Sequence, residues 1–102
     1  MYLRVTRSHF DLAKDEETVR LGEEFAATLR RLPGFRSYHS GMDRTMGTSI
    51  GVSVWDTEEQ ARFSRDALGD IIPRMLEQGL QIDPPEFYEV AAVAYREDLD
   101  RG

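Results

Sequence analysis

The chain has 102 residues, of which 40% are hydrophobic, and it contains no cysteine. Its formal net charge is −6, with 19 acidic against 13 basic side chains. The length predicts a single domain with a two-layer core. The acidic balance argues against nucleic acid and against an anionic membrane as partners, and the lack of cysteine excludes disulfides and thiolate metal sites. The chain shows neither a secretory signal pattern nor an apolar run that could span a membrane, so we expect a cytoplasmic protein.

The N-terminal third predicts a strand and then a helix. Residues 2–10 form the strand, because Leu3 and Val5 alternate with polar side chains. Asp15 has the position of an N-cap, and acidic residues follow it where the helix dipole favours negative charge. Apolar residues then recur at helical spacing until Pro33-Gly34, which ends the helix.

The middle of the chain predicts a pair of strands followed by a second helix. The strands cover residues 35–42 and 48–55, and the residues between them form a turn. Thr57 precedes Gln60 by three residues, which is the spacing of a capping box at a helix N-terminus. The second helix is therefore predicted to begin at Thr57.

The last third predicts the rest of that helix and a final strand. The helix is interrupted near Gly69, starts again at Asp70 and ends at Gly79. Pro84-Pro85 prevents further helix. Residues 86–95 then form the fourth strand.

The resulting order is strand, helix, strand, strand, helix, strand. It predicts an α+β fold of the ferredoxin-like type, βαββαβ, in which an antiparallel four-stranded sheet carries two helices on one face. We assign residues 1–96 to one domain and residues 97–102 to a charged C-terminal tail. Each helix has a single apolar stripe, so the helices cover only one of the two sheet faces.

Alternation along the strands divides their side chains between the covered face and an uncovered face. We expect aliphatic residues on the covered face: Leu3, Val5, Ile50, Val52 and Val54. The uncovered face then carries small, polar and aromatic residues: Arg4, Thr6, Ser8, Ser49, Gly51, Ser53 and Trp55. Such a mixture suits neither a packed core nor a solvated surface. It fits the lining of a cavity that a second subunit closes.

Two segments carry a resemblance to a known family. They are Leu32-Pro33-Gly34-Phe35 before the second strand and Val54-Trp55-Asp56-Thr57-Glu58 at the end of the third. With these segments the chain resembles the antibiotic-biosynthesis-monooxygenase-like superfamily of dimeric α+β barrels. The resemblance implies a homodimer whose two sheets pack face to face. Some members are cofactor-independent monooxygenases acting on polyketide quinols, others degrade haem, and many have no assigned reaction.

The chain also departs from the residues that such relatives use. Haem-degrading relatives have an asparagine on the first strand, and a tryptophan and a histidine on the second helix. This chain contains no asparagine, has Ser64 near the position of that tryptophan, and has no histidine near Arg74. The resemblance therefore argues against haem degradation. Relatives that oxidise quinols use a cavity asparagine as well, so this chain differs from them too.

Three residues are candidates for catalysis. Arg4 can hold a substrate oxyanion, His39 can accept a proton near neutral pH, and Trp55 can stack on an aromatic ring. Each also has a structural explanation: an ion pair for Arg4, a surface position for His39, and packing at the sheet edge for Trp55. The candidate substrate-binding residues all lie on predicted strands: Thr6, Tyr38, Ser53, Trp55 and Tyr88.

Neither a cofactor nor a metal is expected. The glycines form no phosphate-binding motif, and the two histidines have no carboxylate placed beside them. Two functions remain open. One is a cofactor-independent monooxygenase that binds a small aromatic or polyketide-like molecule in the barrel cavity. The other is a non-catalytic homodimer, either small-ligand-binding or structural.

Overall fold

The computed structural model describes residues 1–97, so the predicted charged tail, apart from Glu97, lies outside the described residues. These residues form five strands: β1 (Tyr2–His9), β2 (Phe35–Asp43), β3 (Thr48–Trp55), β4 (Gln81–Ile82) and β5 (Glu86–Glu89). They also form α1 (Asp15–Leu29), α2 (Glu58–Ala61) and α3 (Ile71–Glu77), with the short 3₁₀ helices η1 (Leu12–Lys14) and η2 (Arg65–Leu68). None of the helices in this part of the chain is long and apolar enough to cross a membrane.

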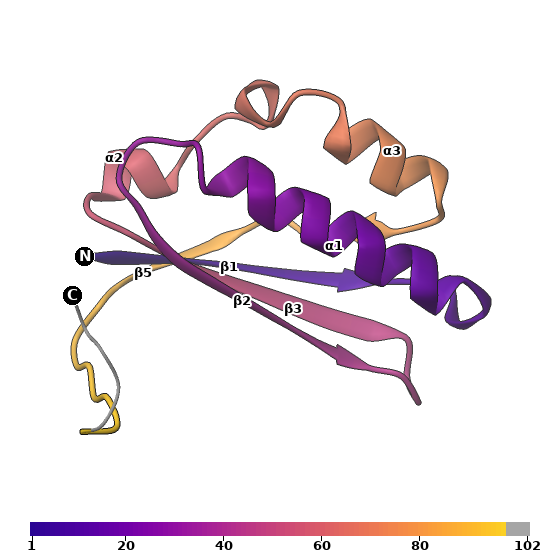
Figure 1. Ribbon diagram of the computed structural model, residues 1–102, viewed down its shortest axis with the longest axis horizontal. Helices are drawn as coiled ribbons and strands as arrows, with labels where there is room; N and C mark the ends of the chain where they lie inside the picture. Colours follow the sequence, from indigo (N-terminus) through magenta and orange to yellow (C-terminus); the bar gives the residue numbers. More distant parts are fainter. Residues whose placement is uncertain (98–102) are drawn as a thin grey trace.

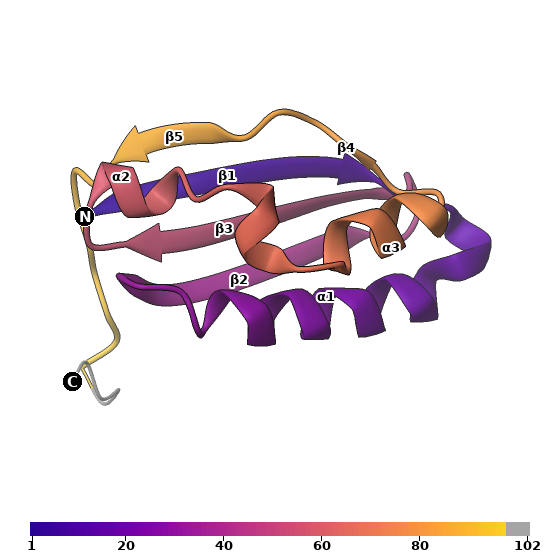
Figure 2. The ribbon, with the colours of Figure 1, turned by 90° about the horizontal axis from the view of Figure 1, so that it is seen from above.

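The strands make one antiparallel sheet with the order β2-β3-β1, and β4 and β5 both pair with the remaining edge of β1. The α-helices lie together on one side of this sheet (Figure 1). Seen from above, α1 runs along the β2 side of the sheet and lies next to α3 (Figure 2). The predicted ferredoxin-like α+β arrangement is therefore confirmed.

The fourth strand of this arrangement is broken into two pieces. β4 pairs with Ser8 and His9 at one end of β1, and β5 pairs with residues 2–5 at the other. Pro84-Pro85 lies between the two pieces and interrupts the strand, because proline has no N–H to donate to the sheet. The strand predicted over residues 86–95 also ends early, at Glu89.

The predicted second helix is divided as well, into α2, η2 and α3. α2 ends at Ala61, and the Ser64 hydroxyl then accepts a hydrogen bond from the Asp66 N–H and caps η2. Gly69, with a φ of +65°, turns the chain before α3 begins at Ile71. The interruption expected near Gly69 is present, whereas the earlier break after α2 was not predicted.

The first helix begins differently from the prediction. The Asp11 side chain accepts a hydrogen bond from the Ala13 N–H and caps η1, which leads directly into α1. Asp15 is consequently the first residue of α1 rather than its N-cap. The acidic side chains of the first turn still lie where the helix dipole favours them.

The core lies between the helices and the sheet, and its largest buried side chain is Trp55. This side chain is 0% exposed, and its ring centroid lies 5.5 Å from that of Phe35 and 5.2 Å from that of Phe63. The indole Nε1 donates a 2.8 Å hydrogen bond to Ser53 Oγ, so the one polar atom of the ring is satisfied. Leu29 of α1 is buried to the same degree.

The two faces of the sheet are the reverse of those predicted. Arg4 pairs with Ser53 across β1 and β3, and both side chains face the helices. The aliphatic set expected under the helices lies on the opposite face and is no part of the core beneath them: Leu3, Val5, Ile50, Val52 and Val54. Alternation shows which residues share a face, but it does not show which face the helices cover. Trp55 and the small polar residues, expected on the uncovered face, are the ones that the helices cover.

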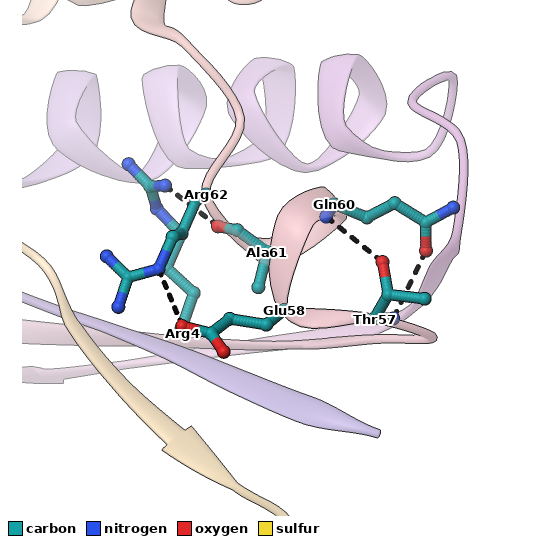
Figure 3. A network of polar contacts seen from close by, with 6 residues as sticks. All are labelled: Arg4, Thr57, Glu58, Gln60, Ala61 and Arg62. Carbon is teal, nitrogen blue, oxygen red and sulfur yellow. Dashed lines mark hydrogen bonds and ion pairs between the residues drawn. The ribbon is translucent and has the colours of Figure 1, made fainter.

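A tight contact joins the turn after α1 to the start of α2. The capping box predicted from Thr57 and Gln60 is present, with both hydrogen bonds 3.2 Å long (Figure 3). The Gln60 side chain packs over Gly34, whose φ is +78° and whose carbonyl accepts a hydrogen bond from the Asp56 N–H. A Cβ at position 34 would lie 1.8 Å from Gln60 Oε1, so glycine is required there for two separate reasons.

We therefore predict that Gly34→Ala destabilises the fold more than Gly79→Ala does. Gly79 also has a positive φ, of +89°, but a Cβ there would meet no atom within 4 Å. Gly79→Ala should cost about 1–2 kcal/mol of unfolding free energy through backbone strain alone. Gly34→Ala should cost roughly 1 kcal/mol more, because the added methyl group displaces the capping glutamine. Urea unfolding of both variants measures the difference, and equal losses would show that the contact with Gln60 is unimportant.

Candidate functional site

A cavity of about 560 Å³ lies between the helices and the sheet. Polar and charged side chains, mostly on the strands, line one part of it: Arg4, Thr6, Ser8, Tyr38, Ser40, Ser49, Ser53 and Arg65. Apolar side chains from the helical layer line the rest: Val19, Phe25, Ala26, Phe63, Leu68, Ile72 and Met75. The volume lies within the roughly 300–1,000 Å³ of small-molecule sites, and the combination of an apolar wall with a few polar groups is typical of them.

Arg4 connects the sheet to the end of α2. Its guanidinium donates a 2.9 Å hydrogen bond to the carbonyl oxygen of Ala61 (Figure 3). It donates a second one, of 3.4 Å, to the carbonyl oxygen of Phe63. The same group stacks on the Phe63 ring, with Cζ 3.9 Å from the ring centroid. These carbonyls belong to the end of α2 and the chain just beyond it, where helical hydrogen bonds run out. Arg4 therefore holds the end of α2 against β1.

The charge of Arg4 is only partly compensated. Burial, together with the nearby positive charges of Arg65 and Arg62, lowers the pKa of its guanidinium to about 10. At neutral pH the group is still cationic. Among residues 1–97, no carboxylate lies within ion-pair distance of Arg4. The cavity thus has one end with a positive potential that an anionic ligand would complement.

Tyr38 contributes a phenol to the same cavity. A β-bulge between Phe35 and Ser37 changes the alternation of β2, so that both Phe35 and Tyr38 face the helices. The Tyr38 ring makes an edge contact with Phe25 of α1, at a centroid distance of 5.5 Å. Burial raises the pKa of the Tyr38 phenol, and a hydrogen bond with the Ser40 side chain lowers this pKa by less than burial raises it. Tyr38 is therefore a hydrogen-bond donor at neutral pH and not a base.

Gly51 makes room for this phenol. A Cβ at position 51 would lie 2.8 Å from Tyr38 Oη and 3.1 Å from Tyr38 Cε1. The absence of a side chain on β3 therefore lets Tyr38 lie flat over the sheet. Farther along the strands, the hydroxyl groups of Ser8 and Ser49 form a hydrogen bond with each other. Small side chains on β1 and β3 thus keep the space below the helices open.

The sequence-predicted site residues divide into three groups. Arg4, Thr6, Tyr38 and Ser53 line the cavity. Trp55 lies in the core, completely buried and outside the cavity lining, so it offers no free face for stacking on a ligand.

His39 and Tyr88 lie on the opposite face of the sheet. His39 pairs with Val52, and Tyr88 pairs with Leu3, which places both side chains away from the helices. Tyr88 is 49% exposed, and its hydroxyl donates a 2.5 Å hydrogen bond to Glu86. The structure therefore does not bring either residue together with Arg4.

Several residues of the cavity were not predicted as site residues, among them Phe25, Phe63 and Arg65. Phe25 belongs to the predicted first helix, but its contact with Tyr38 depends on tertiary packing. Phe63 and Arg65 were placed inside a continuous helix, whereas the chain leaves α2 before Phe63 and turns at Ser64. The pattern Ser64-Arg65-Asp66 was the available signal, since a serine two residues before an aspartate N–H is a typical helix start.

Other features of the described residues are less suited to a site. A groove of about 780 Å³ runs between α1 and α3, but mainly charged and polar side chains line it, and Arg74 and Glu24 form a 2.7 Å ion pair within it. Within residues 1–97, no group of three or more histidine, aspartate or glutamate side chains is arranged to hold a metal ion. The cavity beside Arg4 is therefore the candidate site.

Comparisons with solved structures give the fold a family context. The chain is similar to a protein from Deinococcus radiodurans proposed to be an antibiotic biosynthesis monooxygenase, with a TM-score of 0.75 and 13% identity, covering 94% of this chain and 98% of that one. It is similar to HapK from Hahella chejuensis, with a TM-score of 0.74 and 10% identity, over 94% and 98% of the two chains.

A third structure in this group is SnoaB, a cofactor-independent oxygenase from Streptomyces nogalater. Its TM-score is 0.63 and its identity 17%, over 90% of this chain and 94% of that one. No family model matches the chain, and no curated protein sequence does either. At these identities the comparisons establish the fold, which is that of the antibiotic biosynthesis monooxygenases.

The raised pKa of Tyr38 predicts a pH-dependent difference in stability. In the folded protein this phenol stays protonated above its ordinary pKa of 10.0, whereas in the unfolded chain it ionises there. The folded state then binds more protons, so its stability falls as the pH rises from 10 through the folded-state pKa. Tyr38→Phe lacks this contribution, so it should lose less stability than the wild type over that range. Urea unfolding at pH 8 provides the baseline, because there Tyr38 is protonated in both the folded and the unfolded state. An identical pH dependence of the two proteins would contradict the prediction.

Proposed function

We propose that the protein is a cofactor-independent monooxygenase acting on a small aromatic or polyketide-like molecule bound beside Arg4. The observation that carries the proposal is the cavity itself, in which an arginine without a carboxylate partner among residues 1–97 and a partly buried phenol face an apolar wall. This arrangement suits a flat ligand with an ionisable oxygen at one edge.

The proposed reaction begins with ionisation of the substrate. A ring CH₂ or a phenol of such a molecule loses a proton and leaves an anion whose charge is spread over the rings and their oxygen. Arg4 stabilises that anion by its charge and Tyr38 by donating a hydrogen bond, and both act more strongly beside the apolar wall of the cavity than in bulk water. The proton passes to solvent, since the carboxylates that line the cavity, Glu23 and Asp83, are exposed.

Molecular oxygen is then the oxidant. The substrate anion supplies the electrons, a C–O bond forms to give a peroxide, and loss of water leaves a carbonyl at the former CH₂. One oxygen atom enters the product and the other leaves as water, so the electrons balance without a protein-bound carrier. The protein contributes binding, orientation and charge. The similarity to SnoaB, a cofactor-independent oxygenase, supports this class of reaction.

We also propose that the protein is a homodimer. The aliphatic face of the sheet, formed by Leu3, Val5, Ile50, Val52 and Val54, has no helix over it. A contiguous apolar face of this kind is a poor solvent surface, and a second copy of the same sheet complements it. In such a dimer the sheets meet on the side away from the cavity.

A non-catalytic, ligand-binding homodimer is the second candidate. One observation favours it: no histidine lines the cavity, and the carboxylates that do are exposed, so no buried base stands beside Arg4. A protein that only binds an aromatic anion needs no base. Oxygen consumption distinguishes the two functions.

An oxygen-uptake assay with anthrone and naphthol-like compounds tests the enzymatic proposal. The wild type should accelerate oxygen uptake with at least one compound. Tyr38→Phe keeps the ring contact with Phe25 and should lower kcat/KM about tenfold, which is a loss of about 1.4 kcal/mol of transition-state stabilisation. Arg4→Gln should lower it by at least the same factor.

Arg7→Gln is the matched control, since Arg7 lies on the same strand but on the opposite face, exposed and paired with Glu86. It should leave the rate unchanged. Because Arg4 also holds the end of α2, thermal unfolding of Arg4→Gln must accompany the assay. If Arg4→Gln does not fold, the rate of Tyr38→Phe alone tests the site. Unchanged rates in Tyr38→Phe and in folded Arg4→Gln would rule out this site.

The dimer proposal predicts twice the 11.7 kDa mass of the chain in light scattering at micromolar concentration. Val52→Lys places a charge in the centre of the aliphatic face and should give a monomer, because the lysine would have to be buried without a partner. Leu76→Lys is the control, since Leu76 of α3 is also apolar and 48% exposed but lies on the helical layer. A wild-type monomer at this concentration would refute the homodimer.

A further inference from the structure

The cavity contains a second arginine, Arg65, which the proposed reaction does not use. Arg65 is the first residue of η2, and the cap formed by Ser64 on the Asp66 N–H fixes the backbone on either side of it. The residue lines the cavity and is exposed, so its guanidinium is accessible both to solvent and to a bound molecule. It belongs to the same end of the cavity as Arg4, because Arg4 donates a hydrogen bond to the carbonyl of Phe63, two residues before Arg65, and both arginines line the cavity.

The two arginines differ in what already occupies their hydrogen-bond donors. Arg4 donates to the carbonyls of Ala61 and Phe63 and stacks on a ring, so a ligand meets only its remaining donors. Arg65 has no carboxylate within ion-pair distance among residues 1–97. Its planar fork of donors matches a carboxylate geometrically.

The neighbouring arginines are engaged elsewhere. Arg62 forms a 3.0 Å ion pair with Glu58 and stacks on Phe87, and it does not line the cavity. Arg44 lines the cavity but forms a 2.9 Å ion pair with Asp15. Arg65 is thus the exposed cavity arginine that an acidic ligand can engage without displacing a carboxylate among the described residues.

We propose that Arg65 is a specificity-determining residue that selects aromatic ligands carrying a carboxylate over neutral ligands of the same shape. The ring system of the ligand lies against the apolar wall near Phe63, its ionisable oxygen lies near Arg4, and its carboxylate pairs with Arg65 at the exposed end. The inference uses the cavity of the proposed function, but it concerns binding only and does not require that any reaction takes place.

Binding of two matched probes tests this role. Anthraquinone-2-carboxylate and anthraquinone-2-carboxamide have nearly the same shape, differ in charge and do not consume oxygen. Isothermal titration calorimetry should give the wild type about five- to tenfold tighter binding of the carboxylate, as expected for one charge-assisted contact at a partly exposed site. Arg65→Gln should reduce this preference to less than about twofold and leave the affinity for the carboxamide unchanged.

Arg62→Gln is the matched control for the general effect of removing one positive charge from this end of the molecule. It should retain most of the carboxylate preference, and the preference of the wild type should weaken as the salt concentration rises. A preference that survives in Arg65→Gln, or that falls equally in Arg62→Gln, would overturn the assignment, and so would a failure of both probes to bind. These results are independent of the oxygen-uptake assay. A carboxylate preference without oxygen consumption would support the role of Arg65 and rule out the monooxygenase proposal.

Discussion

The contact of Arg4 with the end of α2 is the constraint on which the rest of the site depends. A guanidinium on β1 reaches across the helix–sheet interface, donates to the carbonyls of Ala61 and Phe63, and stacks on the Phe63 ring. Burying a cation without a carboxylate is unfavourable unless other groups satisfy its donors. Here helix-end carbonyls and a ring face satisfy part of them, and the remaining donors face the cavity. The same interaction therefore positions α2 and leaves charge available for a ligand.

The layer below the helices combines a very large side chain with very small ones. Trp55 fills the space near α2 completely, whereas serine, threonine and glycine occupy the helix-facing positions farther along β1 and β3. Interiors are normally packed without voids larger than a water molecule. The cavity exists because the side chains at Gly51 and its neighbours are too small to reach α1 and α3. On the sheet side it is lined by hydroxyl groups and is therefore polar. Such a space is suited to a ligand. It also lowers the stability of the fold relative to a fully packed core.

The fold was largely predictable from local signals, and the site was only partly so. The capping box at Thr57 and the Pro33-Gly34 helix end are determined by neighbouring residues, and the strand–helix order follows from them. The assignment of faces failed, because it assumed that the more aliphatic face must meet the helices. That assumption fails here, because the aliphatic side chains lie on the face away from the helices, whereas Trp55 and small polar residues lie beneath them.

The residues of the site that escaped prediction depend on longer-range geometry. Arg4, Thr6, Tyr38 and Ser53 were selected for their chemistry and do line the cavity, although on the other side of the sheet from the one expected. Phe63 and Arg65 were missed, because residues 62–68 contain good helix formers that conceal the break after α2. The position of Tyr38 depends on a bulge in β2, which requires the register between two strands and not the residues of one strand.

The reversal of faces separates the two roles that we propose for the sheet, ligand binding and self-association. Arg4, Thr6, Tyr38 and Ser53 line the cavity from the helix side of the sheet, whereas Leu3, Val5, Val52 and Val54 lie on the other face. A dimer interface on the aliphatic face would not contribute walls to the cavity; it would stiffen the sheet from behind. In the proposed dimer, substitutions at Thr6 or Arg65 would change the size or charge of the cavity without altering the surface between the two copies. Such a division of the sheet into a binding face and an association face would be a physical reason why one fold can accommodate different ligands.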